Sequence, residues 1–277
     1  MSSTASSGLS KPAPWRTTFL NSLSKMDSPE FVLATVAPAA SAPTPYLPRA
    51  RYCIFRGMWA ELPENDHNPA ETNEKVYESD LPTFTTDIRM EKISQLFASS
   101  PGKDGLESVE QILGSGGGGE VEAVWWAKGE GVQWRLKGRA FVVGMDMDEG
   151  NDSGVRTVKS EVGERMRVVK GMEGKEEQWR WGKEITGHFG NMSPGMRGTF
   201  RAPPPGQRKD APYDKRLKLG GKVEDLNDEI ARKHFRVCII KPDEVEKLFL
   251  ADPTKAHRWR WTFRKEVGDW EEEELWP

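Results

Sequence analysis

Alternation of apolar and polar residues is the strongest pattern along this chain. Residues 121–127 (VEAVWWA) and 132–143 (VQWRLKGRAFVV) keep a period of two, which predicts two long strands joined in a hairpin. Shorter segments with a strand-like pattern are 31–36, 51–57, 83–86, 235–240 and 258–264. Apolar residues at helical spacing predict helices over 15–26, 89–98 and 176–186. Because strands are many and helices few, we expect a mainly β fold, a barrel or sandwich with peripheral helices.

Polar and glycine-rich stretches interrupt this pattern without dividing it into two domains. We expect residues 1–13 to be a disordered tail and residues 14–277 to form a single domain. Flexible insertions are expected near 114–120, 146–175 and 203–222. The run GSGGGG at 114–119 fits the dinucleotide motif G-x-G-x-x-G, but it precedes a strand, so we interpret it as a connector. The glutamates at 271–274 are interpreted as a solvated charge run.

Composition narrows the possible functions. The 277 residues are 36% hydrophobic and 30% charged, enough apolar residues for a core. The net charge of −3, from 40 Lys and Arg against 43 Asp and Glu, argues against a dedicated duplex-binding protein. The longest apolar run, 31–40, is too short to span a membrane, and the N-terminus lacks the apolar region of a secretory signal. We therefore expect a cytoplasmic protein without membrane or duplex partners.

Cysteines and histidines give no sign of a metal site. Cys53 and Cys238 are too few for a disulfide scaffold or a cysteine-rich zinc site, which favours a reducing compartment. The four histidines lack the spacing of a zinc hydrolase, and the chain contains no G-x-S-x-G motif. We therefore expect no metal, and no side chain can be assigned as a catalytic acid, base or nucleophile.

Cationic and hydroxyl side chains gather at the ends of predicted strands. Arg51 opens a strand with an apolar interior and Arg56 closes it, while Thr85 and Thr86 end the next strand. A guanidinium can grip a phosphate with two parallel hydrogen bonds, and hydroxyls add further donors. Each cation alone is read most simply as an exposed surface residue. The set together predicts an anion site.

The helix that follows strengthens this prediction. Asp87 is the expected N-cap, and Arg89 and Lys92 then lie in the first turn. Cations there oppose the helix dipole, whereas a bound anion would be favoured by the dipole and by free N–H groups. Gln133 and Arg135, two residues apart, share one face of the long hairpin.

The segment 258–264 (RWRWTFR) offers a different interpretation. Trp259 and Trp261 share one face of the strand, and Arg258 and Arg260 the other. Interleaved aromatic and cationic residues could stack and hold single-stranded RNA. A buried tryptophan face opposite an arginine face that lines a site is the simpler account.

Several of these segments also occur, in the same order, in pyridoxamine 5′-phosphate oxidase-like FMN-binding proteins, which this chain resembles. The segments are 31–36, 51–57, 84–92 (FTTDIRMEK), 133–138 (QWRLKG), 193–200 with 204–206, and 260–263 with Trp270 and 275–277. The match runs from about Pro14, in the Pro-Trp opening of the branch common in fungi, plants and cyanobacteria, to Pro277. The resemblance implies a split β-barrel, usually a homodimer, with FMN at the subunit interface.

The resemblance also implies roles for individual residues. Arg51 would hold the FMN phosphate, Cys53 and Ile54 would line the isoalloxazine through main-chain groups, and Arg56 would lie near flavin N5 and the substrate. Further FMN contacts implied in this way are Thr85, Thr86, Lys92, Gln133 and, from the partner subunit, Arg260. Arg89 would replace a hydroxyl that the family often has where this chain has Met90.

The substrate is less well defined. Ala256 and Arg258 stand where the true oxidase has an Arg-x-His that contacts its vitamin substrate, so pyridoxamine phosphate is not implied. Arg197 and Arg258 remain the candidate substrate contacts. Three hypotheses follow: an FMN-dependent oxidoreductase acting through flavin N5, a non-catalytic FMN-binding module that lost its substrate site, and a single-stranded RNA-binding protein.

Overall fold

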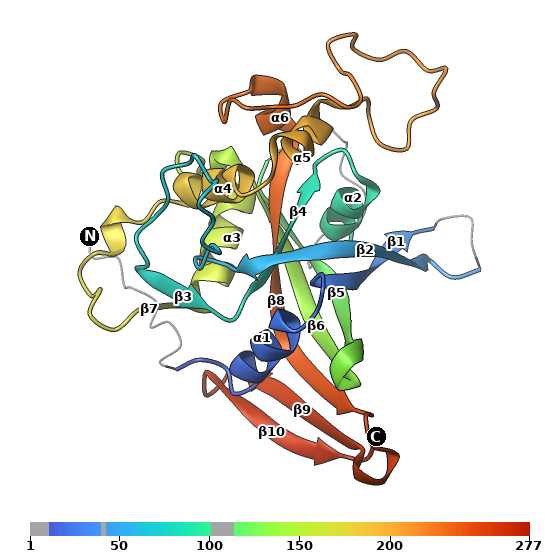
Figure 1. Ribbon diagram of the computed structural model, residues 1–277, viewed down its shortest axis with the longest axis vertical. Coiled ribbons are helices and arrows are strands. Elements are labelled where there is room, and N and C mark those ends of the chain that lie inside the picture. Colours follow the sequence, from blue (N-terminus) through green and yellow to red (C-terminus); the bar gives the residue numbers. More distant parts are fainter. Residues whose placement is uncertain (1–10, 40–42, 101–113) are drawn as a thin grey trace.

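One antiparallel sheet dominates the computed structural model, which describes residues 11–39, 43–100 and 114–277 (Figure 1). Its strands follow the order β10-β9-β8-β4-β2-β1-β5-β6, and β6 also pairs with β8, which closes six of them into a barrel. The strands are β1 (Glu30–Pro38), β2 (Tyr46–Met58), β4 (Pro82–Asp87), β5 (Gly116–Ala127), β6 (Val132–Val143), β8 (Phe235–Phe249), β9 (His257–Arg264) and β10 (Asp269–Leu275). The predicted mainly β fold with peripheral helices is confirmed.

Strand β8 divides the sheet. Its first residues, 235–239, pair with β4, and its last residues, 244–249, pair with β9, while β6 runs along nearly its whole length. The β9–β10 ribbon therefore leaves the barrel as a separate wing, visible at the bottom of Figure 1. A short pair, β3 (Tyr77–Ser79) with β7 (Met166–Val168), lies apart from the main sheet.

The helices cover two sides of the barrel. They are α1 (Arg16–Ser24), α2 (Glu91–Ala98), α3 (Ser153–Gly163), α4 (Trp181–Gly190), α5 (Pro194–Gly198) and α6 (Glu229–His234). In the first core, Phe19 of α1 packs edge-on against Trp125, which in turn stacks on Phe31. In the second core, Phe189 of α4 packs on Phe235 of β8. Alternating residues of β6 and β8 thus face opposite cores, which explains their apolar sequences.

Two segments differ from the sequence predictions. The glycine run is not a connector, because Gly116–Ala127 is one strand and a Cβ at Gly119 would lie 2.6 Å from the carbonyl oxygen of Leu96. Glycine is needed there so that α2 can pack closely on β5. The glutamate run is exposed, as expected, but it is not an irregular tail. It forms most of β10, where Glu273 pairs with Arg260 at 2.9 Å.

The remaining expectations concern loops and the chain start. The stretch 146–175 contains α3 and β7, and 203–222 contains neither helix nor strand. Most of the predicted tail lies outside the described residues. Among the described residues, no helix is both long enough and apolar enough to cross a membrane.

Candidate functional site

A first cluster of predicted site residues lies at the end of the barrel. Arg51 of β2 donates from Nη1 to Thr35 Oγ1 at 2.7 Å and from Nη2 to Gln95 Oε1 at 2.7 Å. Its Nη1 also reaches the carbonyl oxygen of Leu33 at 3.2 Å. The guanidinium is therefore fixed by β1 and α2 without being neutralised. Thr35 and Gln95 were not predicted, although Gln95 lies one helical turn after Lys92.

Lys92 completes this cluster. It is buried, and its Nζ donates to Thr86 Oγ1 at 3.1 Å. Burial lowers the pKa of Lys92, and the nearby Arg51 lowers it further. Cys53 lies between the two cations, and burial raises the pKa of its thiol despite them. Neither cation forms an ion pair anywhere in the part of the chain that the structure describes. Two desolvated like charges without a counter-ion favour an anionic ligand.

Arg89 has a different position from the one predicted. Helix α2 begins at Glu91 with Met90 as its N-cap, so Asp87 is not the N-cap and Arg89 precedes the helix. Arg89 is bound to Asp87 at 2.6 Å and donates to the carbonyl oxygen of Ala202 at 3.0 Å. Its charge is therefore neutralised, and it ties the β4–α2 turn to the segment after α5.

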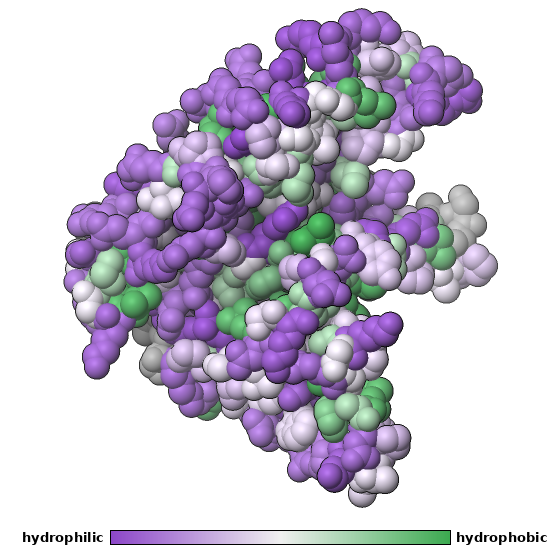
Figure 2. Space-filling view, viewed as in Figure 1, coloured by the Kyte–Doolittle hydropathy of each residue, from purple (hydrophilic) through white to green (hydrophobic). Residues whose placement is uncertain are grey.

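A second group lies on the outer face of β2 and β4. Ile54 and Arg56 project from this face, and the pairing of Phe55 with Phe84 places Thr85 beside Ile54. Ile54 and Tyr52 are solvent-exposed, and Figure 2 shows hydrophobic surface in the middle of this view, over β2. Cys53 points to the opposite, barrel-facing side. The outer face thus presents an apolar surface bordered by a cation.

A cavity of about 380 Å³ opens at the end of this face. Its walls include Arg56, His188 of α4, Asn191 and Met192, and Thr85 Oγ1 lies 3.9 Å from the sulfur of Met192. Arg56 Nε and His188 Nε2 are both buried, and neither finds a hydrogen-bond partner among the described residues. Unsatisfied buried polar atoms are costly, and the Nε donor of Arg56 makes this cavity a candidate for a ligand with acceptor atoms.

His188 was missed because the search of the sequence was for zinc spacing. Its ring stacks on Trp59 with the planes 3° apart, and complete burial, aided by Arg56, lowers its pKa to about 3. The imidazole is therefore neutral at physiological pH, with one N–H donor and one acceptor. Its place four residues after Glu184, on one face of α4, was the available signal.

Other predicted residues lie elsewhere in the chain. Gln133 is on β6, three strands away from Arg51 on β2. The residue of β6 in register with Arg51 is Leu136, and Gln133 is three residues from it. Arg260 is on the β9 wing, paired with Glu273, and Arg258 is on the same strand. Arg197 belongs to α5 and is buried, and its Nε donates to the carbonyl oxygen of Val223 at 2.9 Å. A single chain does not bring these four residues to the Arg51 cluster.

The comparison with known families now bears on this geometry. Residues 12–144 match the family model described as pyridoxamine 5′-phosphate oxidase, FMN-binding domain. This region therefore matches an FMN-binding domain of that family. The resemblance predicted from the sequence is thereby confirmed, as is FMN as the cofactor of the family. Both clusters of β2 side chains lie within the matched residues, whereas Arg197, Arg258 and Arg260 lie beyond them.

Solved structures support the same fold. A pyridoxamine 5′-phosphate oxidase-related, FMN binding protein from Nostoc punctiforme aligns with 96% of this chain and 100% of its own, at 17% identity and a TM-score of 0.55. Identity this low shows the split-barrel fold alone. PhzG from Burkholderia lata, solved with tetrahydrophenazine-1-carboxylic acid, aligns over 98% of this chain and 100% of its own, at 12% identity. The TM-score of this second alignment is 0.45. No curated protein matches the chain.

The residues present fit both the phosphate and the flavin ring of FMN, the cofactor of the family. A phosphate dianion would neutralise Arg51 and Lys92, the two cations of the Arg51 cluster. The carbonyl and nitrogen acceptors of a flavin ring would meet the orphaned donors of Arg56 and His188. The chemistry of each donor set therefore agrees with FMN.

Proposed function

We propose that this protein binds FMN and acts as an oxidoreductase. The observation that carries the proposal is a pair of cations, the buried Lys92 and the half-buried Arg51, without an anionic partner in the described residues. Arg51 and Lys92 would hold the phosphate, with Thr86 as a hydroxyl donor beside them. Arg89 would stay outside this contact, because Asp87 already neutralises it.

The flavin ring would lie on the outer face of β2. Ile54 and Thr85 would flank it, and main-chain groups of β2, including that of Cys53, would line it. FMN, when bound, supplies two-electron redox chemistry by accepting or donating a hydride at N5. Arg56 would stabilise negative charge that develops on the ring. His188, neutral and buried, would donate a hydrogen bond without adding charge.

A homodimer would complete the site. Ile54 and Tyr52 are exposed apolar side chains on the face that would receive the ring, so a second copy covering them would exclude water. Gln133 and Arg260 would then reach FMN from the partner subunit. Arg197 and Arg258 are retained as candidate substrate contacts. We also propose a cytoplasmic location, which the free, buried cysteines support.

Flavin binding is tested by purifying the protein and recording its absorption spectrum, followed by mass analysis of any released ligand. The expected result is a yellow protein that releases FMN on denaturation. The Arg51→Ala variant should bind added FMN about a hundredfold more weakly, since it loses a charge-assisted contact. Lys128→Ala removes an exposed cation at the β5–β6 turn and should bind as the wild type does. A colourless protein that takes up no added FMN would overturn the proposal.

The non-catalytic alternative is kept because Ala256 and Arg258 replace the oxidase's substrate motif. Turnover with oxygen and pyridoxamine phosphate or other donors would distinguish an enzyme from a binding module. The RNA-binding alternative is not favoured. Arg260 and Arg264 of β9 are paired with Glu273 and Glu271 of β10, so the strand is electrostatically neutralised.

A further inference from the structure

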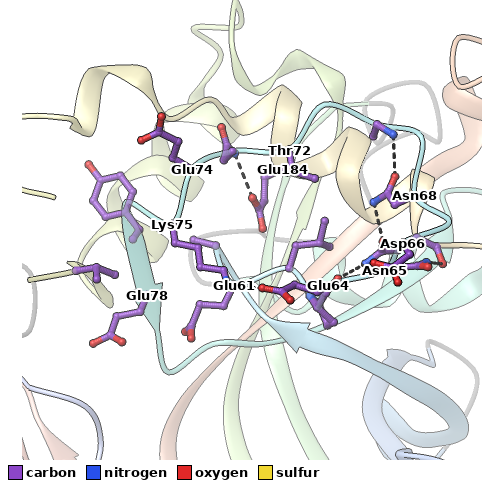
Figure 3. Close-up of a pocket in the computed structure, with 18 residues that line it drawn as sticks. Glu61, Glu64, Asn65, Asp66, Asn68, Thr72, Glu74, Lys75, Glu78 and Glu184 are labelled. Carbon is purple, nitrogen blue, oxygen red and sulfur yellow. Dashed lines mark hydrogen bonds and ion pairs between the residues drawn. The ribbon is translucent and has the colours of Figure 1, made fainter. Parts of the chain in front are cut away.

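A second, larger cavity lies beside the proposed flavin site. The loop between β2 and β3 and the helix α4 enclose about 890 Å³ (Figure 3). This cavity shares Pro63, Glu64, Asn65 and Asn191 with the cavity at Arg56, so the two are neighbours. Nothing in the proposed FMN contacts uses it. Its volume is in the range of cavities that hold small organic ligands.

The walls of this cavity are strongly acidic. Its charged lining residues are Glu61, Glu64, Asp66, Glu74, Lys75, Glu78 and Glu184. Four of the carboxylates have cationic partners: Glu61 with Arg16, Glu64 with Lys75, Glu74 with Lys175, and Glu78 with Arg167. These ion pairs hold the walls together. They leave little spare acceptor capacity for a ligand.

Glu184 differs from the other carboxyls. It is buried, and Figure 3 shows its side chain reaching from α4 into the space enclosed by the loop. Its Oε2 accepts a hydrogen bond from Asn73 Nδ2 at 3.1 Å, and it has no cationic partner in the described ranges. Its Oε1 is buried and receives no hydrogen bond of ordinary geometry from the described residues, although the backbone N–H of Ala60 is near. A buried carboxylate oxygen without a hydrogen bond is unfavourable, so a ligand that donates to it would be stabilised.

The acceptor positions left on the Glu184 carboxylate limit which kind of donor it can bind. A metal ion is disfavoured, because no group of three or more His, Cys, Asp or Glu in the described residues is arranged to hold one. A guanidinium or amidinium binds best when both carboxylate oxygens are free side by side, and Asn73 already donates to one of them. An ammonium group is a compact point donor that can bind a single oxygen.

We propose that this cavity binds a small organic molecule through a primary ammonium group held by Glu184. The other wall glutamates, each paired with a cation, would set the shape of the site, and Asp66 is left without an ion pair among the described residues. The proposal stands without FMN. If both proposals hold, the ligand lies next to the flavin ring.

The test is isothermal titration calorimetry of the full chain, free of FMN, at pH 8 with benzylamine. Benzyl alcohol serves as the uncharged probe of the same shape. Saturable binding of benzylamine, at least tenfold tighter than that of benzyl alcohol, is expected. Glu184→Gln should remove that difference. Glu71→Gln, which changes an exposed carboxylate outside the cavity, should preserve it.

A second variant keeps the test decisive if Glu184→Gln does not fold. Asn73→Ala frees Oε2, so the carboxylate could then accept two parallel hydrogen bonds. The wild type should bind benzylamine more tightly than benzamidine, and Asn73→Ala should reverse that order. Absence of saturable benzylamine binding to the wild type, or equal binding by Glu184→Gln, would overturn the ligand proposal. Neither result would affect FMN binding, which is measured separately by absorbance.

Discussion

The Arg51 cluster and the Glu184 cavity both contain charged groups without a partner of opposite charge in the described residues, but the charges have opposite signs. In the first, the buried Lys92 and the half-buried Arg51 lie against hydroxyl, amide and thiol groups, with no carboxylate partner in the described residues. In the second, a carboxyl is buried against Asn73 with no cationic partner there. Burial shifts each group toward its neutral form, lowering the pKa of Lys92 and raising that of Glu184 to about 7. Both regions are therefore expected to be stabilised by a ligand of opposite charge.

The β9–β10 wing provides the contrast. There Arg260 and Arg264 face Glu273 and Glu271 across the ribbon, and all four side chains are largely exposed. Exposed pairs of this kind contribute little to stability and need no ligand. The comparison teaches that cations in this protein point to a binding site only where they are both desolvated and unpaired.

The largest expected effect on stability is a pH dependence at Glu184. Its folded-state pKa of about 7 lies above its ordinary value of 4.5, so the protonated form is favoured in the fold. The resulting stability is fully present below pH 4.5 and is lost as the pH rises through 7. The free energy of unfolding should fall by about 3 kcal/mol over this pH range. Urea unfolding at pH 5 and pH 8 should show Glu184→Gln lacking this decrease. An identical pH profile in variant and wild type would contradict the interpretation.

Lys92→Met should have two smaller effects: it should raise the stability of the FMN-free protein and lower the affinity for FMN. Replacing a buried, unpaired ammonium by an apolar side chain of similar shape should stabilise the FMN-free protein by about 1–2 kcal/mol. The same change should weaken FMN binding, because one of the two phosphate cations is lost. Thermal unfolding without FMN and fluorescence titration with FMN measure the two effects. A destabilised FMN-free variant would show that Lys92 has a structural role.

The smallest effect is expected on the wing. Arg264→Ala breaks an exposed ion pair with Glu271, so the free energy of unfolding should fall by less than about 1 kcal/mol. FMN affinity should remain as in the wild type, because Arg264 is not among the proposed contacts. Chemical denaturation together with FMN titration checks both points. A large loss of either would show that the wing does more than pair its two strands.

Much of the fold followed from residue patterns. The long hairpin of β5 and β6 was predicted most clearly from β6, where Val132, Trp134 and Leu136 alternate with polar neighbours. Strand pairing at Gly119 could not be predicted, since glycine carries no side-chain pattern and its role depends on the close approach of α2. The β10 strand was missed because four consecutive glutamates resemble a solvated run until their arginine partners on β9 are known.

The site divides in the same way. Arg51, Thr86 and Lys92 were predicted from their places at strand ends and a helix start, and from the family resemblance. Gln95 and His188 could not be identified as partners, because their importance depends on tertiary contacts between separate elements. The sequence also gave no sign that Glu184 would be buried without a cation. Burial decides which of many similar charged residues form a binding site, and the order of residues along the chain does not reveal which side chains are buried.

The central claim is that Arg51 and Lys92 bind the phosphate of FMN. The most direct measurement compares the dissociation constants of FMN and riboflavin, which differ only by that phosphate, in the wild type and in Arg51→Ala/Lys92→Met. We predict that the wild type binds FMN at least about a hundredfold more tightly than riboflavin, and that the double variant binds the two nearly equally. Equal affinity for FMN and riboflavin in the wild type, or an undiminished preference in the double variant, would contradict the account.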